Sequence, residues 1–141
     1  MSELSLVEKV IALEGVDLLA TLSPEHLAAI ATIATEVNVP RGRMILEAGK
    51  PVDALYVVLD GSVELIRDGS VVDTAGQSAV LGAWALLDEE DPILLTARAG
   101  SDTYLLRVGR DDFYDVLADN SDITTAVFSN LVRRFRKLVE A

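Results

Sequence analysis

Residues 76–99, GQSAVLGAWALLDEEDPILLTARA, are the stretch that decides the fold. Gly76 and Gly82 permit backbone turns that other residues adopt only at a cost. The four consecutive acids of 88–91 are typical of a solvated loop, and Pro92 precedes the apolar segment ILLTARA. The stretch therefore predicts turns and a charged loop that lead into a strand.

The segments on both sides of this stretch have the period of two that is typical of strands. Glycine-containing or charged turns separate them, and Asp60-Gly61-Ser62 and Asp68-Gly69-Ser70 suit tight hairpins. The expected strands are EVNV 36–39, MILEA 44–48, ALYVVLD 54–60, SVELIRD 62–68, SVVDTA 70–75, ILLTARA 93–99 and TYLLRVG 103–109. Seven or eight short strands in close succession predict a mainly β fold, a small antiparallel β-barrel or jelly roll.

Helices are expected on both sides of the β region. Apolar residues at helical spacing predict a short amphipathic helix that ends near Gly15, and Ser23-Pro24-Glu25 begins a second that runs to about Thr35. After the strands, 111–118 predict one helical segment and Ser121-Asp122 open a longer one to about Glu140. The chain is therefore expected to be a single domain, helical over 1–35, β-barrel over 36–110 and helical over 111–141.

Composition excludes several classes of protein. The formal net charge is −11, from 23 acids and 12 bases, which disfavours nucleic acid and anionic membrane surfaces as partners. There is no cysteine, so no disulfide is expected. Five charged residues interrupt the first 20 positions, so neither a signal peptide nor a membrane span is expected there, and a cytoplasmic location is favoured. A single histidine, His26, and the lack of a GxSxG or phosphate-loop motif predict a protein that is not an enzyme, without a metal or cofactor.

The order of helices, strands and helices, together with the sequences of several segments, resembles the cyclic-nucleotide-binding domain family, which includes catabolite activator proteins and regulatory subunits of cyclic-AMP-dependent kinase. The resemblance covers roughly residues 18–138. Its carriers are LSPEHL, the turn glycine of EAGK, ALYVVLDGSVELIRDG, the spacing from Gly76 to LGAWALL, and LLRVGRDDFYDVLAD. It implies a barrel that encloses a nucleotide, a short helix after Gly82 whose amides face the cyclic phosphate, and a C-terminal helical lid.

The family's phosphate-binding cassette reads approximately Gly-x-Gly-Asp-x-Phe-Gly-Glu, an aliphatic stretch, and Pro-Arg-x-Ala-Thr. Gly76, Gly82 and Pro92 keep this frame, whereas Ser78 replaces the second glycine and Leu81 the phenylalanine. The spacing therefore supports the fold.

The two polar anchors of the cassette are missing. Ala83 stands where the resemblance places the glutamate that grips the ribose hydroxyl, and Ile93 where it places the arginine that pairs with the phosphate. Removing one partner of a buried charged contact costs about 2 to 5 kcal/mol, so two losses weaken binding by about a thousandfold or more. The acids of 88–91 either repel a phosphate further or form a merely solvated turn.

Apolar side chains are expected in place of the anchors. Ile93 and Leu95 point the same way on a strand and would enter the former pocket, while Trp84 either fills the vacated volume or contacts a partner at the rim. A hydrophobic small ligand remains an alternative. The residues expected to line this degenerate pocket are Gly82, Ala83, Trp84, Ala85, Ile93, Leu94, Leu95 and Thr96.

The last expected helix carries an apolar stripe and a basic cluster. Arg133, Arg134, Arg136 and Lys137 either complement the helix dipole or contact an acidic partner. In relatives this helix forms a dimer seam or transmits the ligand state to an attached domain. The residues expected at such an interface are Val127, Leu131, Phe135 and Leu138.

These observations predict a non-catalytic regulatory or interaction module in which binding of cAMP or cGMP is lost or much weakened. The expected partner is a second copy or a fused or separate protein domain, and no nucleic-acid binding is expected through this chain alone. The alternative function is a small-molecule or cyclic-nucleotide sensor with a non-standard pocket.

Overall fold

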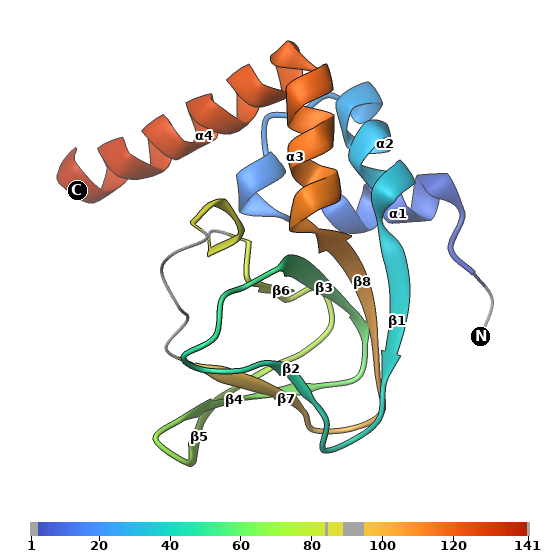
Figure 1. The fold of residues 1–141 in the computed structure, drawn as a ribbon, viewed down its shortest axis with the longest axis vertical. Coiled ribbons are helices and arrows are strands. Elements are labelled where there is room, and N and C mark those ends of the chain that lie inside the picture. Colours follow the sequence, from blue (N-terminus) through green and yellow to red (C-terminus); the bar gives the residue numbers. More distant parts are fainter. Residues whose placement is uncertain (1–2, 84, 89–94, 141) are drawn as a thin grey trace.

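The computed structural model describes residues 3–83, 85–88 and 95–140. N-terminal helices, a β region and two C-terminal helices follow one another along the chain (Figure 1). The helices are α1 (Leu6–Leu13), the 3-10 helix η1 (Asp17–Leu19), α2 (Pro24–Ile33), the 3-10 helix η2 (Ala85–Leu87), α3 (Arg110–Asp119) and α4 (Ser121–Glu140). The strands are β1 (Thr35–Val39), β2 (Met44–Leu46), β3 (Ala54–Asp60), β4 (Val63–Arg67), β5 (Ser70–Ala75), β6 (Val80–Leu81), β7 (Thr96–Ala99) and β8 (Thr103–Gly109).

The strands form two four-stranded antiparallel sheets. One sheet has the order β1-β8-β3-β6 and the other β2-β7-β4-β5. The hairpin β4–β5 pairs Val63 with Ala75 and Arg67 with Ser70, as the predicted Asp68-Gly69-Ser70 turn requires. The predicted hairpin at Asp60-Gly61-Ser62 is wrong, because β3 and β4 lie in different sheets and this turn carries the chain from one sheet to the other. The predicted mainly β fold with flanking helices is confirmed, but among the described residues the sheets face each other and do not close into one barrel.

Two apolar layers hold the domain together. Along β3, Leu55 and Val57 face the helices, while Val58 faces the second sheet. The helical layer also buries Leu86 of η2, Phe113 of α3 and Ile123 of α4, each fully inaccessible to solvent. Because all three belong to one cluster, η2 and the C-terminal helices share a core.

Helix α2 begins at the residues that the sequence predicts. The Ser23 hydroxyl accepts the backbone N–H of His26 at 3.2 Å, and Pro24 occupies the first turn of α2. At α1, Ser5 and Glu8 form a reciprocal capping box. Hydrogen bonding to Ser5, chiefly from its backbone N–H, lowers the pKa of the Glu8 carboxyl.

Within the described residues, no helix has both the length and the apolar character needed to cross a membrane.

Candidate functional site

The described first part of the predicted cassette, residues 76–83, runs through β6 and ends just before η2. Gly82 has a φ of +78°, and a Cβ on it would stand 3.0 Å from the Ala54 carbonyl oxygen and 3.1 Å from Cγ1 of Val52. Only glycine meets both constraints without strain. Backbone sterics therefore fix the start of η2 irrespective of what the site binds.

Ser78 stands at the second glycine position of the predicted cassette and keeps its backbone conformation. Its φ is +72°, in the left-handed region that favours glycine, and its N–H donates to the Val58 carbonyl at 2.8 Å. The turn before β6 therefore forms with a serine in the left-handed region.

The structure places five of the eight predicted pocket residues. Ala83 is buried, with 8% of its surface exposed, and Gly82, Ala85, Leu95 and Thr96 are half-buried. The Thr96 hydroxyl accepts the Ala48 N–H at 3.1 Å and is thereby tied to the loop after β2. Trp84, Ile93 and Leu94 lie outside the described residues.

The space between the two sheets is apolar among the described residues. Its buried side chains are those of Val58, Val63, Leu81, Ala97 and Leu105. The buried polar side chains of the described chain are those of Thr103, Arg110 and Asn130, and none belongs to this cluster. The described part of the lumen therefore offers no buried charge to a phosphate.

A clamp on η2, formed by Arg110 and Tyr114 of α3, was missed by the sequence analysis. Arg110 Nε donates to the Leu86 carbonyl at 2.8 Å, and a terminal nitrogen of the same guanidinium donates to the Ala85 carbonyl at 3.1 Å. The Tyr114 hydroxyl donates to the same Leu86 carbonyl at 3.0 Å. The feature of the sequence that could have indicated this clamp is an arginine at the first position of a helix, where the helix dipole disfavours a cation.

The last helix has an inner and an outer face. The inner face buries Ile123, Val127 and Asn130, and the Asn130 amide donates to the Leu18 carbonyl at 2.9 Å. Successive helical residues are about 100° apart, so Phe128 lies on a different side from Val127. The outer face of α4, as the term is used below, comprises the exposed residues Phe128, Val132, Phe135, Leu138 and Val139.

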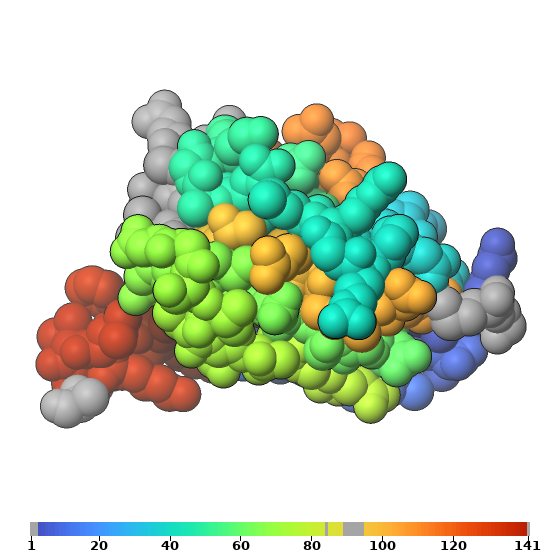
Figure 2. All heavy atoms as spheres, turned by 90° about the horizontal axis from the view of Figure 1, so that it is seen from below, coloured from blue at the N-terminus to red at the C-terminus, as the bar shows by residue number. Residues whose placement is uncertain are grey.

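The predicted interface residues divide between these faces. Val127 is 4% exposed and belongs to the core of the domain, so it is not available at the surface. Leu131 is half-buried, while Phe135 and Leu138 are 64% and 76% exposed. The C-terminal part of α4, red in both views, projects beyond the β region (Figures 1 and 2).

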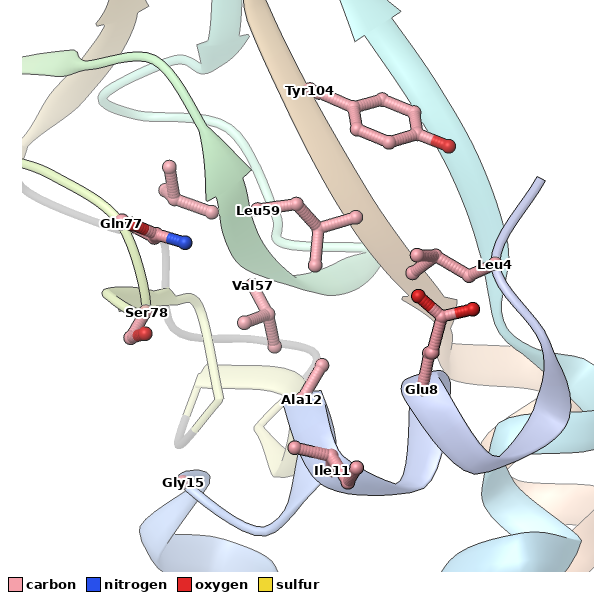
Figure 3. Close-up of a pocket in the computed structure, with 11 residues that line it drawn as sticks. Leu4, Glu8, Ile11, Ala12, Gly15, Val57, Leu59, Gln77, Ser78 and Tyr104 are labelled. Atoms are coloured by element: carbon pink, nitrogen blue, oxygen red, sulfur yellow. The ribbon is translucent and has the colours of Figure 1, made fainter. Parts of the chain in front are cut away.

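A hollow of about 450 Å³ lies between α1 and the outer side of the first sheet (Figure 3). Ile11, Ala12, Val57 and Leu59 give it an apolar lining. Two of its polar groups have partners within the chain: the Glu8 carboxylate accepts from the Ser5 N–H, and the Tyr104 hydroxyl donates to Glu36. This arrangement indicates a packing hollow more than a polar binding site.

Comparison with known proteins agrees with the architecture. The model of the family described as "Cyclic nucleotide-binding domain" matches residues 36–120. The N-terminal domain of a transcriptional regulator from Streptomyces coelicolor A3(2) is 32% identical, superposes with a TM-score of 0.83, and the match covers 92% of this chain and 96% of that one.

Two kinds of curated relatives are longer than this chain. The cAMP-dependent protein kinase regulatory subunit of Emericella nidulans is 32% identical over 113 residues, which is 79% of this chain and 27% of the relative. The CRP-like cAMP-activated global transcriptional regulator of Mycobacterium tuberculosis is 26% identical over 121 residues, 82% of this chain and 54% of the relative. The chain thus spans a quarter to a half of the length of these relatives.

Proposed function

The chain belongs to the cyclic nucleotide-binding domain family, and we propose that within it the chain acts as a non-catalytic regulatory or interaction module of the cytoplasm that binds cAMP and cGMP weakly or not at all. The regulatory role follows the relatives, which include kinase regulatory subunits and transcriptional regulators.

The observation that carries the proposal is the buried methyl group of Ala83 at the beginning of η2. Ala83 is buried, directly follows Gly82, whose conformation close packing restricts, and stands where the resemblance places the family's glutamate. A methyl group accepts no hydrogen bond from a ribose hydroxyl. The sequence likewise offers Ile93 where the resemblance places an arginine.

The apolar lumen supports the same conclusion. A nucleotide placed between the sheets would lose the hydration of its phosphate, and the described lumen residues supply no charge in return. Backbone amides alone would have to replace the water.

Calorimetric titration with cAMP and with cGMP tests the proposal. We expect no saturable heat at ligand concentrations up to the high micromolar range. The double variant Ala83→Glu/Ile93→Arg should gain affinity because it restores both anchors, whereas Ala83→Gln/Ile93→Met, of similar bulk without charge, should not. Saturable micromolar binding by the unaltered chain would overturn the proposed loss of binding.

A second candidate function is that of a sensor with a non-standard pocket, and one observation favours it. Tyr56, Ile45 and Leu65 pack against the lumen cluster but remain only half-buried, which leaves apolar surface next to a closed core. A small apolar molecule would cover that surface. Binding of the fluorescent apolar probe ANS, lowered by Ala75→Leu on the lumen side of β5 and unaffected by Ser70→Ala at its start, would support this function.

For the partner, we propose that α4 associates with a second copy of the chain or with another protein domain through its outer face. Phe128 and Phe135 are both 64% exposed and lie two turns apart on one side of the helix. Such a continuous apolar stripe is costly to leave in water.

Light scattering on size-exclusion fractions tests the homodimer. A dimer is expected, and Phe135→Glu/Leu138→Glu should convert it to monomer. Val71→Glu/Val72→Glu is the matched control, because it places the same two charges on exposed apolar residues of β5. If the unaltered chain is monomeric at high concentration, the homodimer is excluded and another protein domain remains as the proposed partner.

A further inference from the structure

We propose that a groove along α1, lined in its middle by Ile11, Ala12 and Val57, receives the basic C-terminal end of α4 from a second copy of the chain. This inference rests on the proposed association through the outer face of α4, and it names the surface of the second copy that this face contacts. The two contacting surfaces are therefore different, a helix on one copy and a groove on the other.

The groove along α1 consists of three adjoining hollows. The hollow of about 450 Å³ shown in Figure 3 forms its middle and shares Gly15 and Ser78 with a hollow of about 520 Å³ that reaches Asp17. At the other end it shares Tyr104 with a hollow of about 410 Å³ that reaches Glu3. The groove therefore follows the whole of α1, whose 8 residues span roughly 12 Å.

The groove is apolar in its middle and acidic along its length. Val57 of β3 and Ala12 of α1 line the middle together with Ile11, which is 60% exposed. The acidic residues that line the three hollows are Glu3, Glu8, Asp17 and Glu36. The one basic residue among the described lining residues is Lys9, whose ammonium donates to the Ala34 carbonyl at 2.9 Å. A segment with an apolar stripe and positive charges would complement this surface.

The C-terminal end of α4 has these complementary features. Every residue of 132–140 is exposed, and this part of the helix is roughly 14 Å long, close to the length of the groove. Four of the 12 bases of the chain lie within residues 133–137. At about 100° per residue, Arg134 and Arg136 border the apolar stripe of the outer face on its two sides. Insertion of the apolar stripe of a helix into an apolar groove is a recurring mode of recognition.

The helix end and the groove that it fits must belong to different copies. The C-terminal end of α4 and α1 lie at opposite sides of the domain in two perpendicular views (Figures 1 and 2). The preceding part of α4 is held on its own body, where the Asn130 amide donates to the Leu18 carbonyl. Because a chain with a net charge of −11 repels its own copies on average, its basic end is the part of its surface that the acidic groove of a second copy attracts.

Two complementary variants of the full chain test the two surfaces separately. Ile11→Arg places a cation in the groove and keeps α4 intact, and it should weaken self-association roughly tenfold or more. Phe135→Glu/Leu138→Glu alters α4 and keeps the groove intact. Leu6→Arg is the matched control, because Leu6 is an exposed residue of α1 about 140° around the helix from Ile11 and is not among the described lining residues.

Light scattering on size-exclusion fractions measures the outcome at a concentration at which the unaltered chain associates. Each of the two variants alone should have the mass of one copy, and Leu6→Arg should associate like the unaltered chain. An equimolar mixture of the two variants should have the mass of two copies, because the intact α4 of the first still fits the intact groove of the second. Added salt should weaken the association of the unaltered chain, and an association that salt leaves unchanged would contradict the charge complementarity.

Two results would overturn the groove as the docking site and keep the proposed association. One is an Ile11→Arg chain that still forms dimers, which would indicate contact between two α4 helices. The other is a mixture that stays at the mass of one copy although circular dichroism shows both variants to be folded.

Failure of the proposed association has a different signature. If the unaltered chain is monomeric at high concentration, a second copy is refuted as the occupant of the groove, while another protein domain remains as a partner of α4. If dimers persist in Phe135→Glu/Leu138→Glu, the outer face of α4 is refuted as the contact surface, and the inference drawn from it fails as well.

Discussion

Gly82→Ala is expected to destabilise the domain through two separable causes. The first is the backbone: a side chain at a φ of +78° costs about 1 to 2 kcal/mol, of which about 0.4 to 1 kcal/mol is recovered because alanine restricts the unfolded chain. The second is crowding, because the new Cβ would meet the Ala54 carbonyl oxygen at 3.0 Å and Val52 Cγ1 at 3.1 Å. Overpacking against atoms that cannot easily move costs about 1 to 3 kcal/mol.

Gly69→Ala separates these causes. Gly69 has nearly the same φ, +80°, but nothing lies within 4 Å of its virtual Cβ. Its substitution should therefore cost only the net backbone contribution, about 0 to 1.6 kcal/mol. Gly82→Ala should cost about 1 to 4.6 kcal/mol in total, because the 1 to 3 kcal/mol of crowding is added.

Urea denaturation followed by far-ultraviolet circular dichroism measures both variants. The difference between their free energies of unfolding reports the crowding alone, provided the slopes with denaturant agree. Equal losses for Gly82→Ala and Gly69→Ala would refute the conclusion that close packing against Ala54 and Val52 fixes the start of η2.

Three further outcomes are expected. Asn130→Ala should lower the free energy of unfolding by about 1 to 3 kcal/mol, because the buried Leu18 carbonyl loses its donor; Thr125→Ala, at an exposed position on the same helix, should not. Ser23→Ala should cost about 1 kcal/mol through loss of the helix cap, measured by the same denaturation. Ser5→Ala should raise the pKa of Glu8 only part of the way toward its ordinary value of 4.5, observed by NMR titration, because it removes the side-chain hydrogen bond and keeps the larger one from the backbone N–H. Because the folded-state pKa is lowered, the stabilisation by Glu8 is present above pH 4.5 and is lost as pH falls through the folded pKa. A full return of the pKa to 4.5 in Ser5→Ala would contradict the backbone N–H as the main cause.

The strands were the most predictable part of the fold. β3, β5 and β8 begin and end at the residues that the alternation of apolar and polar side chains predicts. Turn glycines helped to mark the ends of the strands: Gly69 adopts a positive φ in the β4–β5 hairpin, and Gly61 adopts one where the chain passes from β3 of one sheet to β4 of the other. β6 was not predicted, because two residues are too few to show a period.

The faces of α4 could not be assigned from sequence. Periodicity identified one apolar stripe, whereas the helix has an inner face with Val127 and an outer face with Phe128 and Phe135. Which face meets the body depends on the crossing with η1, where Asn130 binds Leu18. That contact joins residues 112 positions apart and leaves no local signal.

The clamp on η2 escaped prediction for a related reason. Arg110 and Tyr114 bind backbone carbonyl oxygens, and because every residue has such a carbonyl, no sequence pattern marks the acceptor. Only the opposition between an arginine and the dipole at the start of α3 pointed to a partner, and it did not identify η2.

The fold and the ligand depend on different parts of the same turn. The start of η2 is fixed by contacts of Gly82 with the backbone of Ala54, and its end by hydrogen bonds to the carbonyls of Ala85 and Leu86. None of these contacts requires a particular side chain at position 83. A substitution at position 83 that leaves Gly82 and the two carbonyls in place should therefore preserve the turn, so the architecture of the domain does not by itself determine what the turn binds.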